Sequence, residues 1–236
     1  MQLVAAESFW ELYPEARSGV VVAHELENDR GAEAASDLLA REAAARMDEL
    51  AAIEITADSR VAPWRAAYSR FGAKPSKYRS SIESLLRAAQ AGRIRSINPL
   101  VDLYNAVSLR HGLPCGGEDL AAVVGNVLLT RAQGGEPFRT IGAAADEPAP
   151  QGEVIYRDDI GAICRCWNWR EADRTKLTAQ TRDAVLVIEA LSEHTPEQLD
   201  AALADLAALI GRHLGGRTRI AVLTSATPSC SLEAQP

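Results

Sequence analysis

The sequence predicts an α+β protein, that is, one that mixes helices with strands. Apolar residues recur at helical spacing in residues 31–55 and 195–214. Residues 19–26 and 183–191 are apolar runs of the length expected for buried strands. Residues 153–169 contain two apolar runs around a polar turn at residues 158–161, a pattern typical of a β-hairpin.

Composition places the chain among ordinary globular proteins. Of its 236 residues, 47% are hydrophobic and 24% are charged, so it is long enough to bury a sizeable core. The N-terminus lacks a basic leader followed by an apolar run, and no segment reaches the ~20 apolar residues that span a bilayer. We therefore expect a cytoplasmic protein with no membrane partner.

The cysteines and histidines indicate neither a metal site nor a cofactor. Cys115, Cys164, Cys166 and Cys230 lack the paired spacing of zinc ligands, and the four histidines are scattered. Cys164 and Cys166 are two apart in an expected strand, so they would face the same side. Motifs for phosphate, dinucleotide and zinc binding and for a nucleophilic serine are absent.

Helix signals divide the first half of the chain into four segments. In residues 31–55 the apolar stripe is Leu39, Ala43, Met47 and Leu50. Pro63 opens a short helix that ends near residue 72, and Pro75 is placed to begin the next, which ends at residue 92. Asn98 would cap a helix that runs to Gly112.

The second half begins with residues 113–120, which predict a glycine-rich loop. After it, residues 121–132 fit a helix followed by a strand. Residues 143–152 form the one linker-like stretch. Thr195, Pro196 and Gln198 form a capping box before a long helix, and a strand follows Gly215-Gly216. The sequence has no internal repeat, so we expect residues 1–236 to form a single domain.

The segment WNWREADRT, residues 167–175, is the strongest candidate for a binding site. As a strand it would point both Trp rings to one face and Asn168 to the other. Rings that close off a site, with carboxylates, amides and hydroxyls to orient a ligand, are typical of a pocket wall. The alternative is a Trp pair in the core followed by a polar loop. The candidate binding residues are Trp167, Asn168, Trp169, Arg170, Asp173 and Thr175.

A second polar cluster lies on the predicted helix after Asn98. Asn98, Asp102 and Asn105 share one helix face, and Gly116-Gly117 would let backbone approach a ligand closely. The alternative is a helix cap with a hydrogen-bonding face, and Glu118 would then be only an acid near the start of the next helix.

Charge is unevenly distributed in this acidic protein, whose net charge is −7. Residues 1–54 contain twelve acidic and four basic residues, whereas residues 65–95 contain eight basic residues and only one acidic residue. The basic stretch is either a solvated helix face or a surface for phosphates. Its candidate phosphate contacts are Lys74, Lys77, Arg79 and Arg87.

Residues 97–120, INPLVDLYNAVSLRHGLPCGGEDL, resemble the editing and tRNA-binding domain of the phenylalanyl-tRNA synthetase beta subunit. The matching positions are Val101, Asp102, Asn105, Gly112, Pro114 and Asp119. Residues 77–89 and 152–175 are similar to the free-standing bacterial form of that domain. The resemblance covers residues 74–191, which it identifies as an editing-like core between an N-terminal segment, 1–73, and a C-terminal helix and strand, 192–225.

The resemblance implies a barrel-like mixed or antiparallel sheet surrounded by helices. It also implies hydrolysis of an amino acid wrongly attached to tRNA, with Glu171 as the catalytic residue. The family has a histidine where this chain has Gly116, and two glycines where it has Trp169 and Arg170. The chain is too short for the synthetase's other domains, so we do not expect a complete aminoacyl-tRNA ligase.

Two functions follow as expectations. The first is a tRNA-binding, editing-like hydrolase that acts on the aminoacyl ester at the tRNA acceptor end. The second is a module that binds RNA or an amino acid without catalysis. A third reading is an interaction protein whose pocket is vestigial.

Overall fold

Two sheets and six helices make up the computed structural model, which describes residues 1–234. The six-stranded sheet has the order β10-β1-β4-β5-β6-β7, and the four-stranded sheet has the order β3-β8-β2-β9. The fold is α+β, as predicted, and neither sheet closes into a barrel. The strands are β1 (Gln2–Ala5), β2 (Arg17–His24), β3 (Cys115–Asp119), β4 (Val127–Arg131), β5 (Val154–Arg157), β6 (Ala162–Arg165), β7 (Arg170–Glu171), β8 (Ala184–Ala190), β9 (Arg217–Leu223) and β10 (Ser229–Ser231).

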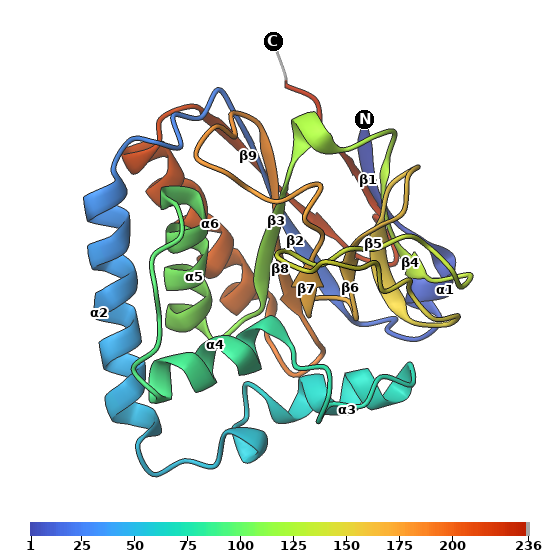
Figure 1. The fold of residues 1–236 in the computed structure, drawn as a ribbon, viewed down its shortest axis with the longest axis horizontal. Coiled ribbons are helices and arrows are strands. Elements are labelled where there is room, and N and C mark those ends of the chain that lie inside the picture. Colours follow the sequence, from blue (N-terminus) through green and yellow to red (C-terminus); the bar gives the residue numbers. More distant parts are fainter. Residues whose placement is uncertain (235–236) are drawn as a thin grey trace.

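The helices are α1 (Glu7–Trp10), α2 (Ala32–Leu50), α3 (Ala62–Arg70), α4 (Ser81–Gln90), α5 (Pro99–His111) and α6 (Pro196–His213). Figure 1 shows α2, α5 and α6 on one side of the four-stranded sheet and the six-stranded sheet on its other side. The packing of α6 on β2 is close, because a Cβ at Gly19 would lie 2.7 Å from Leu203 Cδ1. Helices thus cover one face of the four-stranded sheet and leave the other for the second sheet.

Local capping signals explain where the best-predicted helices begin. Asn98 accepts a hydrogen bond from the Val101 N–H at 3.1 Å, and Thr195 and Gln198 form the expected capping box. All five predicted stripe residues of α6 are buried: Leu199, Leu203, Leu206, Ile210 and Leu214. These predictions are confirmed.

The prediction that Pro75 begins a helix is wrong. Residues 75–77 form a turn, and α4 begins at Ser81 because the Ser80 side chain caps the N–H of Glu83. In α2, the predicted inward residue Met47 is instead 40% exposed, whereas Leu38 and Leu39 are buried.

Two strand predictions also differ from the structure. Residues 115–119, predicted as a loop, form β3, an edge strand paired with β8. The strand predicted to run through WNW ends at Arg165, and Cys166 and Trp167 adopt left-handed backbone conformations (φ 47° and 66°). Cys166 therefore lies outside the strand that contains Cys164, and the prediction that both cysteines face one side of a single strand is wrong. The hairpin of β5 and β6 around residues 158–161 is confirmed.

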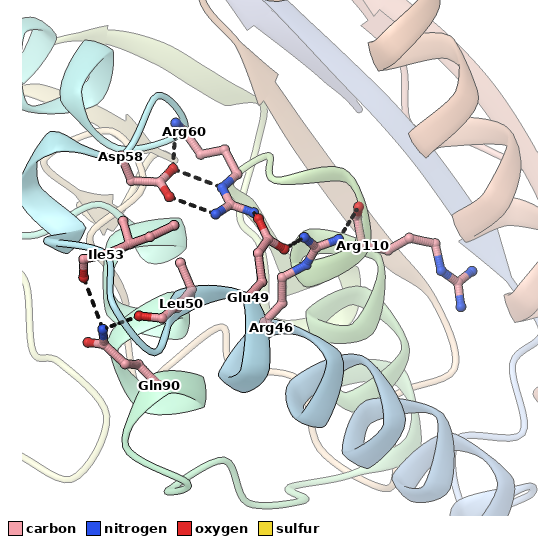
Figure 2. Close-up of polar contacts among 8 residues, drawn as sticks. All are labelled: Arg46, Glu49, Leu50, Ile53, Asp58, Arg60, Gln90 and Arg110. Atoms are coloured by element: carbon pink, nitrogen blue, oxygen red, sulfur yellow. Dashed lines mark hydrogen bonds and ion pairs between the residues drawn. The ribbon is translucent and has the colours of Figure 1, made fainter.

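A polar network joins the C-terminal end of α2 to the segments that follow it (Figure 2). Gln90 of α4 donates to the carbonyl groups of Leu50 and Ile53 at 2.7 and 3.1 Å, which satisfies acceptors that the helix end leaves free. Arg60 pairs with Asp58 at 2.6 Å and with Glu49 of α2 at 2.9 Å. These contacts fix the end of α2 against the end of α4 and against the segment that precedes α3.

Candidate functional site

A cavity of about 370 Å³ lies between the two sheets, a size typical of small-molecule sites. Residues from both sheets line it, together with the loop after β6 and parts of α4 and α5. Its lining includes Leu3, Ser81, Tyr104, Asn105, Gly116, Gly117, Glu118, Val127, Thr140, Ile141, Tyr156, Ile163, Cys164, Trp167, Asn168, Trp169, Arg170, Glu171, Val185, Val187 and Glu189.

Strand alternation explains which side chains of β3 and β8 face the cavity. Gly116 pairs with Val187 and Glu118 with Val185, and side chains opposite each other in a pair share a face. Glu189 is two residues beyond Val187 and therefore lies on the same face. The intervening residues of β8 face the helices.

Glu171, at the end of β7, reaches back to the edge of β3. Its Oε1 accepts a hydrogen bond from the Gly117 N–H at 2.9 Å. Burial raises the pKa of Glu171 to about 7, although the bond from Gly117 opposes this shift. A Cβ at Gly116 would lie 2.8 Å from the same oxygen, so the missing side chain at position 116 makes room for this carboxyl group.

Two further carboxyl groups line the cavity. Glu118 is 6% exposed, and burial together with the negative charge of Glu171 raises its pKa well above the usual range. Burial also raises the pKa of Glu189 to about 7. The Glu189 carboxyl accepts hydrogen bonds from Ser18 at 2.7 Å and from the Tyr156 hydroxyl. A cavity that holds three such groups favours a ligand with positive charge or hydrogen-bond donors.

Two buried polar atoms of the lining, Ser81 Oγ and Asn168 Nδ2, have no hydrogen-bond partner among residues 1–234. The Trp167 ring N–H lies near the Glu189 carboxyl and the Thr175 hydroxyl near the Glu118 carboxyl, in contacts looser than an ordinary hydrogen bond. Asn168 is oriented by Tyr68, whose hydroxyl donates to Asn168 Oδ1 at 2.9 Å, so its amide nitrogen is the free end. Buried polar groups are ordinarily paired, and these atoms have almost no accessible surface, so a ligand would reach them only after the side chains move.

The two tryptophans of the WNW segment, Trp167 and Trp169, differ in burial and in packing partners. Trp167 is fully buried, and its ring packs edge-on against Phe9 and Trp64, with centroids 4.9 Å apart in each pair. Trp169 is partly buried and packs edge-on against Tyr78, with ring centroids 4.8 Å apart. Trp167 therefore belongs to the core and also lines the cavity, so it combines the two alternative interpretations of this segment.

The structure brings together eight of the predicted site residues in the cavity lining. They are Asn105, Gly116, Gly117, Trp167, Asn168, Trp169, Arg170 and Glu171. Asn98, Asp102, Asp173 and Thr175 do not line it. Asn98 caps α5, and Asp102 accepts from the Ile97 N–H at 2.9 Å, so both act in the local structure of that helix. Asp173 pairs with Lys176 at 2.7 Å, and Thr175 is fully buried.

The predicted phosphate-contact residues surround a buried carboxylate. Glu83 is fully buried and lies 3.0 Å from Arg87, 3.0 Å from Arg65 and 3.9 Å from Arg79. Lys77 is exposed and lies 3.7 Å from Glu147, and Lys74 is exposed. Ser81, the first residue of α4, lines the cavity, so this basic region adjoins the mouth of the site.

Sequence reasoning missed Glu118, Glu189 and Tyr156 as parts of the site. The sequence predicts Glu118 in a loop and Glu189 within an apolar strand, and neither pattern marks the residue as part of a site. Strand alternation was the available signal, because Glu189 continues the row of Val185 and Val187. A charged residue in a buried strand usually has a local partner or a function.

Residues 1–234 contain no helix long and apolar enough to cross a membrane. Nor do they contain a group of three or more His, Cys, Asp or Glu residues suited to a metal ion.

Comparison with known proteins identifies the family. No curated protein matches the chain in sequence. The crystal structure of an N-terminal fragment of the phenylalanyl-tRNA synthetase beta-subunit from Pyrococcus horikoshii is similar, with a TM-score of 0.46 and 12% identity. The match covers 92% of this chain and 50% of that one, so the chain spans about half the length of that fragment. The model of the B3/4 domain matches residues 63–215, more than half of the sequence, and the chain therefore belongs to the B3/4 domain family.

Proposed function

We propose that the protein binds the acceptor end of tRNA and hydrolyses the ester of a mischarged aminoacyl-tRNA. The observation that carries the proposal is Glu171. Its carboxyl group lies in the cavity between the sheets, is held by a backbone N–H, and has a pKa raised to about 7 by burial. A base with a pKa near the working pH is well matched to activating water.

In the proposed reaction, water attacks the ester carbonyl carbon while its proton passes to Glu171. The tetrahedral intermediate then collapses, the bond to the ribose oxygen breaks, and that oxygen receives the proton from Glu171. Asn168 lines the cavity, and its side-chain amide is the candidate donor to the developing oxyanion. The Gly117 N–H is already used by Glu171, so it is not available for this role.

The basic region beside the cavity supports binding of the acceptor-stem phosphates. Arg79 and Arg87 pair with Glu83 and keep part of each side chain exposed, and Lys77 and Lys74 are exposed nearby. Anchored arginines lose less freedom when they bind a phosphate. Lys77→Ala should weaken tRNA binding and reduce its salt dependence by about one counterion.

Release of amino acid from mischarged tRNAs tests the proposal directly. Glu171→Gln keeps the shape of the side chain but removes the base, and should lower the rate about 100-fold or more. Asn105→Ala tests a second predicted residue of the lining. Melting temperature and tRNA affinity should remain near wild type for Glu171→Gln. Absence of release from all twenty charged tRNAs would reject hydrolysis.

A binding module without catalysis is the second candidate. One observation favours it: Gly116 stands where the family has a histidine, and no histidine is present among the described residues that line the cavity. This candidate predicts that amino acids or tRNA raise the melting temperature while the ester remains intact.

A further inference from the structure

Four strands lie at the edges of the two sheets, and they differ in how well their outer side is covered. The edges of the six-stranded sheet are β10 and β7, which have only three and two residues. At one edge of the four-stranded sheet, β3 is covered by Glu171, which accepts a hydrogen bond from the Gly117 N–H. The other edge is β9, seven residues long, and within residues 1–234 it pairs with β2 alone. In this part of the chain β9 is therefore the one long open edge.

The open edge of β9 lacks the features that usually prevent pairing with another chain. Proteins protect such an edge with proline, outward-pointing charges or a bulge. β9 contains neither proline nor lysine, and its register with β2 is continuous over residues 217–223. Its two arginines are held within the molecule, since Arg217 pairs with Glu25 at 3.1 Å and Arg219 donates to the Ser231 carbonyl. At the centre of the strand, Ile220 is 43% exposed.

One flank of α6 lies above this edge. Leu199 and Leu203 point to β2, because a Cβ at Gly19 would lie 2.9 and 2.7 Å from their side chains. Since α5 packs beside α6 and against β3, the opposite flank of α6 faces outward past β9. Helical spacing assigns four residues to this flank, three of them Ala or Gly: Asp200, Ala204, Ala207 and Gly211. The flank is open, because a Cβ at Gly211 would meet no atom within 4 Å.

We propose that β9 pairs with β9 of a second copy of this chain, antiparallel and centred on Ile220, to form a two-fold dimer. α6 packs against both β2 and β9, and neighbouring strands lie about 4.8 Å apart. A helix centred over β2 and β9 lies about 5 Å from the dimer axis, which places the two copies of α6 about 10 Å apart. This is an ordinary distance for packed helices, and the small residues of the flank permit it. A lone peptide strand would leave the flank uncovered, so the geometry favours a second copy.

The register of the proposed pair brings no like charges together. With Ile220 opposite its own copy, Arg219 lies opposite Ala221 and Arg217 opposite Leu223 of the other chain. Like charges directly opposite each other destabilise a strand pair, and a register centred on Arg219 would have that defect. The exposed isoleucine is instead buried against its copy at the axis.

The charges of α6 are complementary in the same arrangement. The N-terminal part of the helix has exposed Glu197 and Asp200, and its last turn has Arg212 and His213. A two-fold axis makes the two copies of α6 antiparallel, so the acidic end of each lies beside the basic end of the other. The cavity is lined by β3 and β8, on the side of the sheet away from β9. Both cavities therefore remain accessible, and the dimer does not depend on the proposed hydrolysis.

Sedimentation analysis of the full chain tests the dimer. We expect the wild type to sediment with twice the mass of one chain. Ile220→Lys should raise the dissociation constant at least tenfold, because two charges would meet at the axis. Ile160→Lys is the matched control, since Ile160 is similarly exposed (49%) but lies in the β5–β6 turn, and it should leave the dimer intact. A wild type that stays monomeric up to about 0.1 mM, where any tighter association would be detected, would overturn the proposal.

Cysteine crosslinking tests the register in a Cys230→Ser background, because the other three cysteines are buried. Directly opposite residues of an antiparallel pair have Cα atoms about 4.5–5.5 Å apart, a distance that a disulfide spans. Ile220→Cys should therefore form covalent dimers rapidly on mild oxidation. The copies of Thr218→Cys would lie about 13 Å apart along the strands and should crosslink no faster than Ile160→Cys. Equal rates for Ile220→Cys and Thr218→Cys would reject the proposed pairing.

Discussion

Gly116 and Gly117 are neighbours in β3, yet the space around them differs. A Cβ at Gly116 would meet only the flexible Glu171 carboxyl, at 2.8 Å. A Cβ at Gly117 would lie 2.8 Å from the backbone oxygen of Val185 and 2.6 Å from the Leu186 side chain. The first glycine makes room for the proposed base, and the second allows β3 to pair closely with β8.

We expect Gly116→Ala and Gly117→Ala to separate activity from stability. Gly116→Ala should displace Glu171 and lower hydrolysis about 10- to 100-fold, since small shifts of a catalytic group have effects of this size. Its melting temperature should change little. Gly117→Ala should destabilise the protein by about 1–3 kcal/mol, because backbone must move. Denaturant unfolding and deacylation assays measure both. Equal loss of stability in the two variants would contradict this division.

The raised pKa of Glu171 predicts how the rate depends on pH. Its base form predominates only above about pH 7 and falls about tenfold per pH unit below it, so kcat/KM should rise roughly tenfold per pH unit below that value and level off above it. The measurement is a pH–rate profile on a mischarged tRNA. A profile that is flat between pH 5 and 8 would contradict the assignment of Glu171 as the base.

The contribution of a buried carboxyl group such as Glu189 to stability should fall as pH rises, whereas the rate of hydrolysis should increase. A carboxyl group whose pKa is raised in the folded state stabilises the fold below its unfolded pKa, and that contribution is lost as pH rises through the folded value. For Glu189, with a folded pKa of about 7, the loss between pH 4.5 and 8 amounts to roughly 3 kcal/mol. The difference in unfolding free energy between wild type and Glu189→Gln should therefore vary over this interval.

At the scale of single elements, predictions succeeded where the determining contacts were local. The Asn98 cap and the Thr195 capping box use residues within three positions of each helix start, so sequence alone reveals them. The strand β3 depends on pairing with β8, about seventy residues away, and its glycines look like a loop without that partner. The turn at Trp167 depends on burial among Phe9, Tyr13 and Trp64, which no local pattern encodes.

In the candidate site too, the sequence reveals local patterns and misses contacts between residues that are distant in the chain. Glu171 and the WNW segment were predicted because they concentrate polar residues and resemble a family motif. Glu118 and Glu189 were not, since their place in the cavity follows from the register of two strands. Strands β1 and β10 were also missed, because they pair the two ends of the chain, with Gln2 opposite Ser231.

The turn of the β5–β6 hairpin is held by Asp158, which is 1% exposed. Its carboxylate accepts bonds from the Val124, Ile160 and Gly161 N–H groups and from Arg174. Burial alone would raise the pKa of Asp158, but these bonds outweigh it and hold the pKa below the usual value. The carboxylate therefore stabilises the fold above pH 4, and this contribution is lost as pH falls.

We expect Asp158→Asn to destabilise the protein by about 2–4 kcal/mol at pH 7, because Arg174 loses its charged partner and one oxygen acceptor is replaced by a donor. Chemical unfolding measures the change. Asp146→Asn is the control, since the pair of Asp146 with Arg139 is exposed on both sides and should contribute less than 1 kcal/mol. Similar losses in both variants would refute the role given to the Asp158 turn.

At the scale of the whole molecule, segments outside the family match complete both sheets. The B3/4 match covers residues 63–215, but β2 lies between β8 and β9 in the four-stranded sheet. β1 likewise joins β4 to β10 in the other sheet. The N-terminal residues thus supply a central strand, and Leu199 and Leu203 of α6 pack against its Gly19.

We therefore predict that residues 63–215 do not fold alone and that the chain acts as one cooperative unit. Without β2, strand β8 would keep only β3 as a neighbour, and α6 would expose its apolar stripe to water. Circular dichroism of this fragment should show no cooperative melting, whereas the full chain should melt in one transition. A fragment of residues 17–223 retains β2 and β9 and should fold with reduced stability, because it lacks β1 and β10. If residues 63–215 melt cooperatively near the temperature of the full chain, the core is independent and the N-terminal strands are accessory.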